Sequence, residues 1–189
     1  MITGLEKIWK FEVRFDLSNK KYIAILGFLG NDRKINIPKS IYVNYEEINV
    51  TTIEDNAFAD CTDLTSITIP ASVTTIGDDA FARCYNLTSI IIPSSVVAIG
   101  DCAFVDCFEL TSVTIPASVT SVGSSAFREG SYNVYYDNTG IPSTWKNDWK
   151  DNFQGNFYIK SATMPISNPN DSNIDGYWHY VNGKPEVLI

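Results

Sequence analysis

The chain is poor in histidine, the side chain on which catalytic triads and many metal sites depend. Its 189 residues include one histidine, His179, so a Ser-His-Asp or Cys-His arrangement would have to use it. The residues around His179 match neither a nucleophile elbow nor a metal-ligand spacing, and no glycine-rich phosphate loop occurs. We therefore expect His179 to lie on a strand surface, and we expect no enzymatic activity, no catalytic residue, no cofactor and no metal.

Basic residues and long apolar runs are scarce as well. Fourteen Lys and Arg stand against 22 Asp and Glu, which gives a net charge of -8. Nucleic acids and anionic membranes select basic surfaces, so neither is expected as a partner. No apolar run approaches the ~20 residues of a membrane span, so direct membrane insertion is not expected. The N-terminal stretch MITGLEKIWKFEV lacks a basic region followed by an apolar one, so no export signal is visible in it.

What the sequence does contain is an internal repeat of 23 residues. Five kinds of position recur at this period, and the chance of five independent columns sharing one spacing is negligible. The columns are Phe58, Phe81, Phe104 and Phe127; Pro70, Pro93 and Pro116; Leu64, Leu87 and Leu110; Ile53, Ile76, Ile99 and Val122; and Cys61, Cys84 and Cys107.

Each unit contains the pattern L-x-x-[IV]-x-I-P, as in LTSIIIP, which predicts a short strand. Strand side chains alternate between two faces, so Ile90 and Ile92 would point inward while Ser89 and Ile91 point outward. The proline that follows has no amide hydrogen and ends the strand. After it we expect a glycine turn with positive φ at Gly100 and a short helical or 3₁₀ turn capped by Asp101. One unit cannot bury enough apolar surface to offset the cost of ordering it, so the coils must stack.

The segment IGDDAFARCYNLTSIIIPSSVVAIGDCAF closely resembles the BspA-like leucine-rich repeat, whose units run I-G-x-x-A-F-x-x-C-x-x-L-x-x-[IV]-x-I-P. The resemblance covers residues 53–127. It implies a curved repeat solenoid, mainly β with short helical or 3₁₀ turns, with parallel strands lining one side and β-rich caps. It also implies an extracellular or cell-surface location, mostly in bacteria, and a role in adhesion or in recognition of host or cell-surface molecules.

The ends of the chain read as caps for this stack, within one structural domain. Residues 1–50 predict an N-terminal hairpin and a degenerate first repeat, with a nine-residue insertion near YVNYEEINV, and residues 51–130 hold the repeats. Residues 131–189 predict an aromatic-rich C-terminal cap, with a short helix in IPSTWKNDWKDNF, strands in SYNVYYDNTG and NFYIKS, a loop in SNPNDSNIDG and a hairpin around Asn182-Gly183.

Two ladders of repeated residues have alternative interpretations. Cys61, Cys84 and Cys107 would stack as buried free thiols, although a disulfide or a metal remains open; Cys102 would be a free surface thiol. Asp55, Asp78 and Asp101 would each cap their own turn, with a calcium site as the alternative. Arg83, between Asp60 and Asp106 in one column, would form a solvated ion pair between coils.

Two surfaces are candidate binding sites for a protein or glycan. The first is the outward strand face, made of Ser66, Thr68, Ser89, Ile91, Ser112 and Thr114. The second is an aromatic patch in the last third of the chain, made of Trp145, Trp149, Tyr177, Trp178 and Tyr180, which could equally serve as capping residues. We expect a monomeric, non-enzymatic module that recognises a protein or glycan at the cell surface. The alternatives are a structural or intracellular protein-interaction scaffold, and carbohydrate or cell-wall binding through the aromatic patch.

Overall fold

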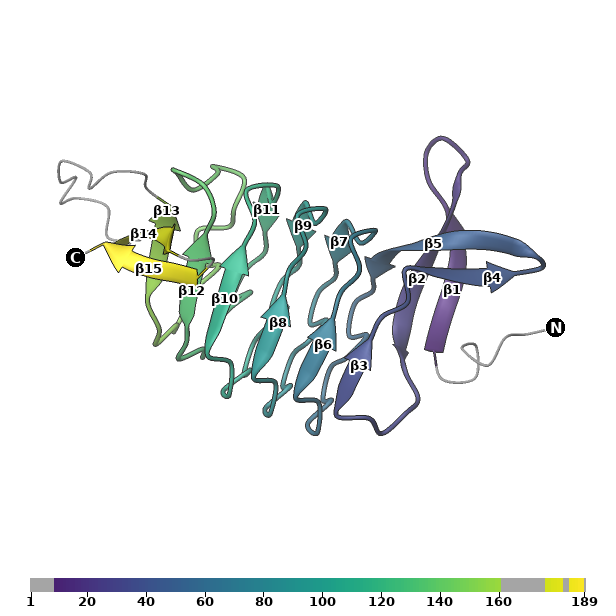
Figure 1. The fold of residues 1–189 in the computed structure, drawn as a ribbon, viewed down its shortest axis with the longest axis horizontal. Helices are drawn as coiled ribbons and strands as arrows, with labels where there is room; N and C mark the ends of the chain where they lie inside the picture. Colours follow the sequence, from purple (N-terminus) through teal and green to yellow (C-terminus); the bar gives the residue numbers. More distant parts are fainter. Residues whose placement is uncertain (1–8, 161–175, 182–183, 189) are drawn as a thin grey trace.

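The computed structural model is a solenoid in which short β-strands from successive coils lie side by side (Figure 1). It describes residues 9–160, 176–181 and 184–188, the last two ranges as backbone only. The strands are β1 Trp9–Phe15, β2 Lys21–Phe28, β3 Lys34–Asn36, β4 Ser40–Val43, β5 Glu46–Ile53, β6 Ser66–Thr68, β7 Thr75–Ile76, β8 Ser89–Ile91, β9 Ala98–Ile99, β10 Ser112–Ile115, β11 Ser121–Val122, β12 Asn133–Tyr136, β13 Phe157–Lys160, β14 Gly176–Val181 and β15 Lys184–Leu188.

The coils pair in register, so each repeat column becomes a row of neighbours across the solenoid. On one side β3, β6 and β8 pair in parallel, with Ile67 opposite Ile90, and β10, β12 and β13 continue this side. On the other side β5, β7, β9 and β11 pair in parallel, with Ile53, Ile76 and Ile99 in one row. The parallel solenoid expected from the 23-residue period is confirmed.

The core contains a continuous column of phenylalanine rings. Phe58, Phe81, Phe104 and Phe127 are fully buried, and their rings stack at centroid distances of 5.3, 5.4 and 5.3 Å. A tryptophan lies edge-on at each end of the column: Trp9 is 6.3 Å from Phe58, and Trp149 is 5.8 Å from Phe127. Edge-on packing places the positive edge of one ring against the negative face of the next. The two tryptophans thus end the phenylalanine column, and the core continues past Trp149 to Phe157.

The turns between the two sides are not helical, which corrects the expected helical or 3₁₀ turns: the described residues contain no helix. Two columns in each turn instead have positive φ, such as Asn56 at 58° and Asp60 at 59°. Amides there bond to the adjacent coil, for example from Phe58 N to Ala80 O at 2.8 Å. Hydrogen bonds between coils, rather than a local helix, therefore fix the turn conformation.

The glycine after each second-side strand is required for close approach and not for positive φ. Only Gly27 has positive φ among the described glycines. A Cβ placed on Gly100 would lie 2.4 Å from Asp78 Oδ1 and 2.5 Å from the Asp78 amide nitrogen of the preceding coil. Gly77 and Gly123 have the same contacts with Asp55 and Asp101. The glycine column lets neighbouring coils approach at the corner.

The N-terminal region contains the predicted hairpin. Strands β1 and β2 pair antiparallel, and β2 then pairs in parallel with β5. The predicted insertion is a second hairpin, β4–β5, whose turn residues Asn44 and Tyr45 both have positive φ, and it extends beyond the body of the solenoid (Figure 1). Arg14 Nη1 lies 2.5 Å from Glu54 Oε1, so an ion pair joins the first hairpin to the first full coil.

The C-terminal segment continues the solenoid instead of closing it at residue 130. Strand β12 pairs in parallel with β10, β13 pairs with β12, and β14 pairs with β13. The strands expected in SYNVYYDNTG and NFYIKS are therefore confirmed, and so is the final hairpin, because β14 pairs antiparallel with β15. The helix expected in IPSTWKNDWKDNF is wrong, since this segment forms successive turns. The loop expected in SNPNDSNIDG lies largely outside the described residues.

Candidate functional site

The outward strand face gathers the six residues proposed from sequence onto three neighbouring strands. Ser66 and Thr68 lie on β6, Ser89 and Ile91 on β8, and the rest on β10; all six are partly or fully exposed. Strand alternation turns their apolar neighbours, such as Ile90 and Val113, into the core. The face is thus an uncharged hydroxyl surface interrupted by one large apolar side chain, Ile91, which is 79% exposed.

A hollow of about 430 Å³ opens on this face between β8 and β10. Its lining includes Ser89, Ile91, Ser112, Thr114 and Asp137. The strand pairing is interrupted at this seam, because the three-stranded sheet ends at β8 and the five-stranded sheet begins at β10. The bond from Thr111 N to Thr88 O is 3.4 Å long, against 3.0 Å for the equivalent bond from Thr88 N to Thr65 O. The seam therefore provides a concave feature on an otherwise regular sheet.

The outward row of the strand face continues onto two tyrosines that the sequence analysis did not single out: Tyr135, which is buried, and Tyr158, which is half-buried. Tyr135 of β12 lies opposite Thr114, and Tyr158 of β13 lies opposite Tyr135. Their rings stack at 5.3 Å. The signal was present in the sequence, because Tyr158 follows Tyr135 by one 23-residue period. Beside them, Lys160 Nζ pairs with Asp137 Oδ1 at 2.6 Å at the edge of the hollow.

The prediction that Trp145 and Trp149 belong to an exposed aromatic patch is wrong. Trp145 and Trp149 are 4% and 3% exposed, and their rings pack edge-to-face at 5.4 Å. They lie one period after Val122 and Ala126, so they occupy core columns with larger rings. Tyr177, Trp178 and Tyr180 lie on β14, but their side chains are outside the described residues. The two described tryptophans of the patch pack in the core and offer no exposed aromatic platform.

A different aromatic pair is exposed on the turn side. Tyr85 and Phe108 stack at 5.7 Å with almost parallel rings, and Phe108 is 52% exposed. The period places them in one column with Thr62 and Ser131, so the pair could have been found from sequence by its spacing. Nearby, Arg83 bonds to both carboxylate oxygens of Asp60, at 2.6 and 2.8 Å, which confirms half of the expected charge pairing. Arg83 in turn lowers the pKa of Asp60.

The four cysteines are free thiols, and their surroundings disfavour the thiolate form. Cys84 and Cys107 are buried, and each donates to a backbone carbonyl at 3.2 Å, those of Phe58 and Phe81. Burial raises the pKa of Cys84 strongly and that of Cys107 to about 12. Cys61 and Cys102 are half-buried, so Cys61 is less enclosed than expected and Cys102 less exposed. Desolvation raises their pKa values as well, so none of the four is a ready nucleophile.

The aspartate ladder joins coils instead of capping single turns. Asp55 Oδ1 accepts the Asp78 amide at 2.8 Å, Asp78 Oδ1 accepts the Asp101 amide at 2.7 Å, and Asp101 Oδ1 accepts the Ser124 amide at 2.7 Å. The expectation that each carboxylate caps its own turn is therefore wrong. Within the described ranges no group of three or more His, Cys, Asp or Glu is arranged to hold a metal ion, and no helix is long and apolar enough to cross a membrane.

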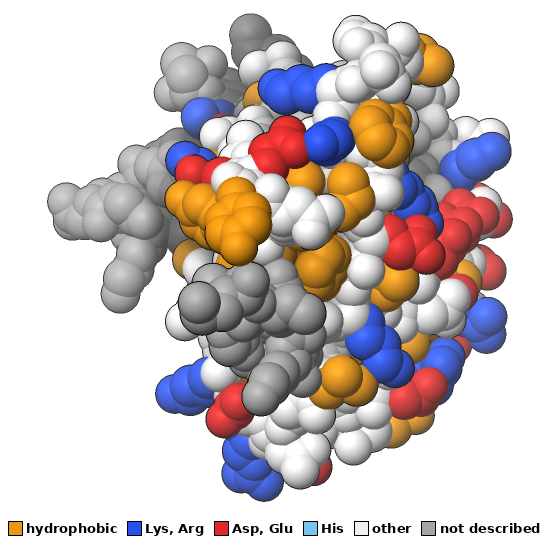
Figure 2. All heavy atoms as spheres, turned by 90° about the vertical axis from the view of Figure 1, so that its right-hand side faces the viewer, with side chains coloured by type: hydrophobic (Ala, Val, Ile, Leu, Met, Phe, Trp, Pro, Cys, Tyr) orange, Lys and Arg blue, Asp and Glu red, His pale blue; other side chains and the backbone are white. Residues whose placement is uncertain are grey.

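The N-terminal end of the solenoid carries a mixed surface. Figure 2 shows hydrophobic side chains interspersed with both signs of charge on this end. The net charge is concentrated elsewhere, because residues 51–130 hold two basic against ten acidic residues. His179, which was expected on a strand and not in a site, lies on β14 opposite Glu186, so its strand location is confirmed.

Comparison with known families gives one match that covers most of the solenoid. The family described as BspA type leucine-rich repeat region matches in six copies across residues 33–160. The repeat therefore extends at both ends beyond residues 53–127, the range over which the repeat pattern is regular. Among proteins with curated functions, none matches this chain.

Solved structures of bacterial leucine-rich repeat proteins have the same fold. The leucine-rich repeat protein of T. pallidum is 22% identical with a TM-score of 0.64, over 80% of this chain and 68% of its own. A leucine-rich repeat protein from Bacteroides capillosus is 28% identical with a TM-score of 0.58, over 68% of this chain and 94% of its own. A leucine-rich cell surface protein from Faecalibacterium prausnitzii is 24% identical with a TM-score of 0.53, over 84% of this chain and 55% of its own.

Proposed function

Because the chain belongs to the BspA-type leucine-rich repeat family, we propose that it is a non-enzymatic binding module that recognises a protein or glycan at a cell surface. Repeats of this kind generally serve protein interaction or occur in surface proteins. The fold alone does not specify a ligand, so the binding surface must be argued from its residues. The similarity to a protein named as a cell surface protein supports the proposed location.

The observation that carries the proposal is the strand face with its hollow. A large apolar side chain that is 79% exposed on a rigid sheet loses little conformational freedom on binding, because its backbone is already fixed. In the adjacent coils the same column holds Thr68 and Thr114, so Ile91 is not needed to complete the repeat. The surrounding hydroxyls supply hydrogen-bond donors and acceptors around this apolar contact. This combination is typical of a binding centre with a polar surround.

The test compares two exposed apolar residues of the same coil on opposite sides of the solenoid. Wild-type chain, Ile91→Asp and Val97→Asp are assayed by surface plasmon resonance against immobilised extracellular-matrix proteins and oligosaccharides. Val97 is 44% exposed and precedes β9, so it is a matched control. We expect Ile91→Asp to weaken binding at least about thirtyfold, the effect of a 2 kcal/mol hot spot. Equal binding by all three chains, or no binding to any surface tested, would contradict the proposal.

A further inference from the structure

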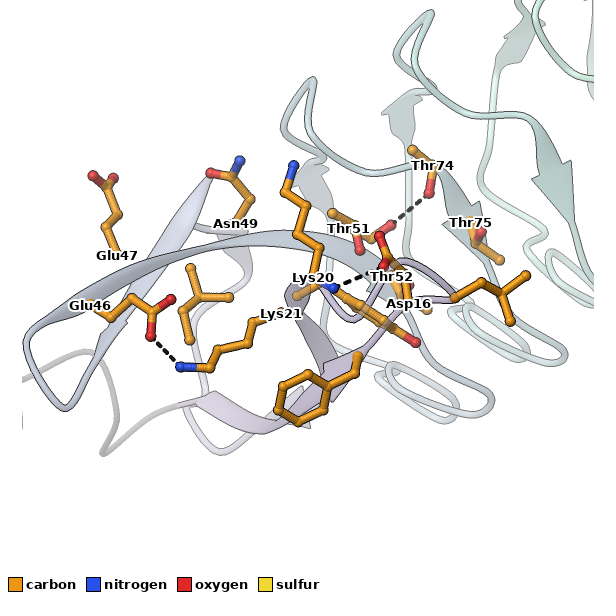
Figure 3. A pocket seen from close by; sticks show the side chains of 14 residues that line it. Asp16, Lys20, Lys21, Glu46, Glu47, Asn49, Thr51, Thr52, Thr74 and Thr75 are labelled. Carbon is orange, nitrogen blue, oxygen red and sulfur yellow. Dashed lines mark hydrogen bonds and ion pairs between the residues drawn. The ribbon is translucent and has the colours of Figure 1, made fainter.

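A second hollow lies away from the strand face, where the N-terminal hairpins meet the first coils (Figure 3). Its volume of about 680 Å³ is within the ~300–1,000 Å³ range of small-ligand sites. It is formed by the β1–β2 turn, by β5 and by the start of β7, segments far apart in sequence. Its lining is Phe15, Asp16, Leu17, Lys20, Lys21, Tyr22, Glu46, Glu47, Ile48, Asn49, Thr51, Thr52, Thr74 and Thr75.

The carboxylates of this N-terminal hollow are already engaged by the protein. Asp16 Oδ1 accepts the amides of Ser18 and Lys20 at 2.8 and 3.0 Å, which fixes the turn that forms one wall. Glu46 pairs with Lys21 across the hollow. Glu47 accepts the hydroxyls of Ser40 at 2.6 Å and Tyr42 at 3.2 Å, and these bonds lower its pKa.

Several polar side chains of the lining remain available to a ligand. Lys20, Asn49, Thr52 and Thr75 make no side-chain hydrogen bond or ion pair within the described part of the chain. Figure 3 shows them around the hollow, from the turn, from β5 and from β7. They offer an ammonium, an amide and two hydroxyls, a set that contains both hydrogen-bond donors and acceptors. Such a set complements a ligand that carries many hydroxyl groups.

Two apolar residues of the lining are exposed to solvent. Phe15 is 56% exposed and Leu17 is fully exposed. A pyranose ring has hydroxyls around its edge and C–H groups on its faces, so it can bond to the polar wall while packing on an exposed aromatic ring. Charge argues against a polyanionic sugar, because two lysines face three carboxylates in the lining.

We propose that the N-terminal hollow binds a neutral oligosaccharide, with the Phe15 ring as the apolar contact and Lys20, Asn49, Thr52 and Thr75 as hydrogen-bonding groups. The site is separate from the strand face, so it does not depend on the function proposed there. A chain with two such surfaces could hold a glycan at one end while its strands contact another ligand.

The test is an NMR titration of ¹⁵N-labelled full chain with maltotriose, cellotriose, chitotriose and mannotriose, each up to about 10 mM, which detects millimolar dissociation constants. A hyaluronan tetrasaccharide supplies the anionic comparison. We expect at least one neutral trisaccharide to shift the amides of Lys20, Thr52 and Thr75. Phe15→Ala and Thr75→Val should each weaken this binding about fivefold or more, whereas Phe108→Ala, which removes an equally exposed ring elsewhere, should not.

Several results would overturn the proposal. These are the absence of shifts with every neutral sugar, binding of the anionic sugar alone, or binding that neither Phe15→Ala nor Thr75→Val weakens. Ile91→Thr distinguishes the two surfaces. It should leave trisaccharide binding unchanged, and a loss of binding in this variant would move the sugar to the strand face.

Discussion

Replacing Phe104 by alanine tests how much of the stability lies in the phenylalanine column. The Phe104 side chain is fully buried, and its ring lies between those of Phe81 and Phe127 at 5.4 and 5.3 Å. Removing a buried phenylalanine ring costs about 3–5 kcal/mol, because its contacts are lost and a cavity remains. Stacked neighbours on both sides favour the upper part of that range, since each aromatic pair adds about 0.5–1.5 kcal/mol beyond burial.

Phe108→Ala is the matched control for this prediction. Phe108 also stacks on a ring of the preceding coil, Tyr85, but it is 52% exposed and has one aromatic partner. Its loss should cost less than about 1.5 kcal/mol. Urea unfolding followed by far-ultraviolet circular dichroism gives both free energies from the midpoint and slope. A cost below about 1 kcal/mol for Phe104→Ala, or equal costs for the two variants, would refute the stacked-core argument.

Three further predictions follow from the turns and the thiols. Gly100→Ala should destabilise the fold by at least about 2 kcal/mol in the same urea assay, because its Cβ would lie 2.4 Å from Asp78 Oδ1, whereas Gly140→Ala, with no atom within 4 Å, should be neutral; a neutral Gly100→Ala would contradict the close approach of coils. Cys102→Asn should raise the free energy of unfolding by about 0.5–1 kcal/mol, because Cys102 has a φ of 53° and asparagine tolerates this region better; destabilisation would show that its thiol makes a contact that matters more. Cys84 and Cys107 should resist iodoacetamide at pH 8 in the native chain and react once the chain is unfolded. The reason is that burial raises the pKa of both thiols, to about 12 for Cys107, so that the reactive thiolate is not populated at pH 8. Mass spectrometry of the labelled peptides checks this, and labelling of Cys84 in the native chain would contradict it.

The parts of the fold that the sequence predicts well are those set by the repeat itself. A fixed period places Phe81 and Phe104 in one column whatever the conformation between them, so the core and the parallel strands could be inferred. The same arithmetic would have found Trp145 and Trp149, which lie one period after Val122 and Ala126, but the many aromatic residues in the last third of the chain suggested a surface patch or a cap instead.

The turns and the N-terminal hollow could not be predicted in the same way. The residues from Asp55 to Asp60 are compatible with a helical turn, yet amides in this run bond to carbonyl groups of the adjacent coil. A contact between coils leaves no signal in the local sequence. The aspartate carboxylates accept backbone amides of the next coil, which is likewise a contact between coils that the local sequence does not reveal. The N-terminal hollow depends on where Lys20 and Thr75, 55 residues apart, are brought by hairpin placement. The strand face could be predicted in part. The alternation of side chains along a strand predicts which residues are exposed, but it does not predict the seam beside Ile91.

The most direct test of the stacked-coil account is ring-to-ring nuclear Overhauser contact in a perdeuterated chain with protonated phenylalanine rings. Unbroken contacts from Phe58 through Phe81 and Phe104 to Phe127 are the predicted result, since successive ring centres lie 5.3–5.4 Å apart. Assigned rings without those contacts would contradict the stacking of coils, and the binding surfaces built upon it would lose their basis.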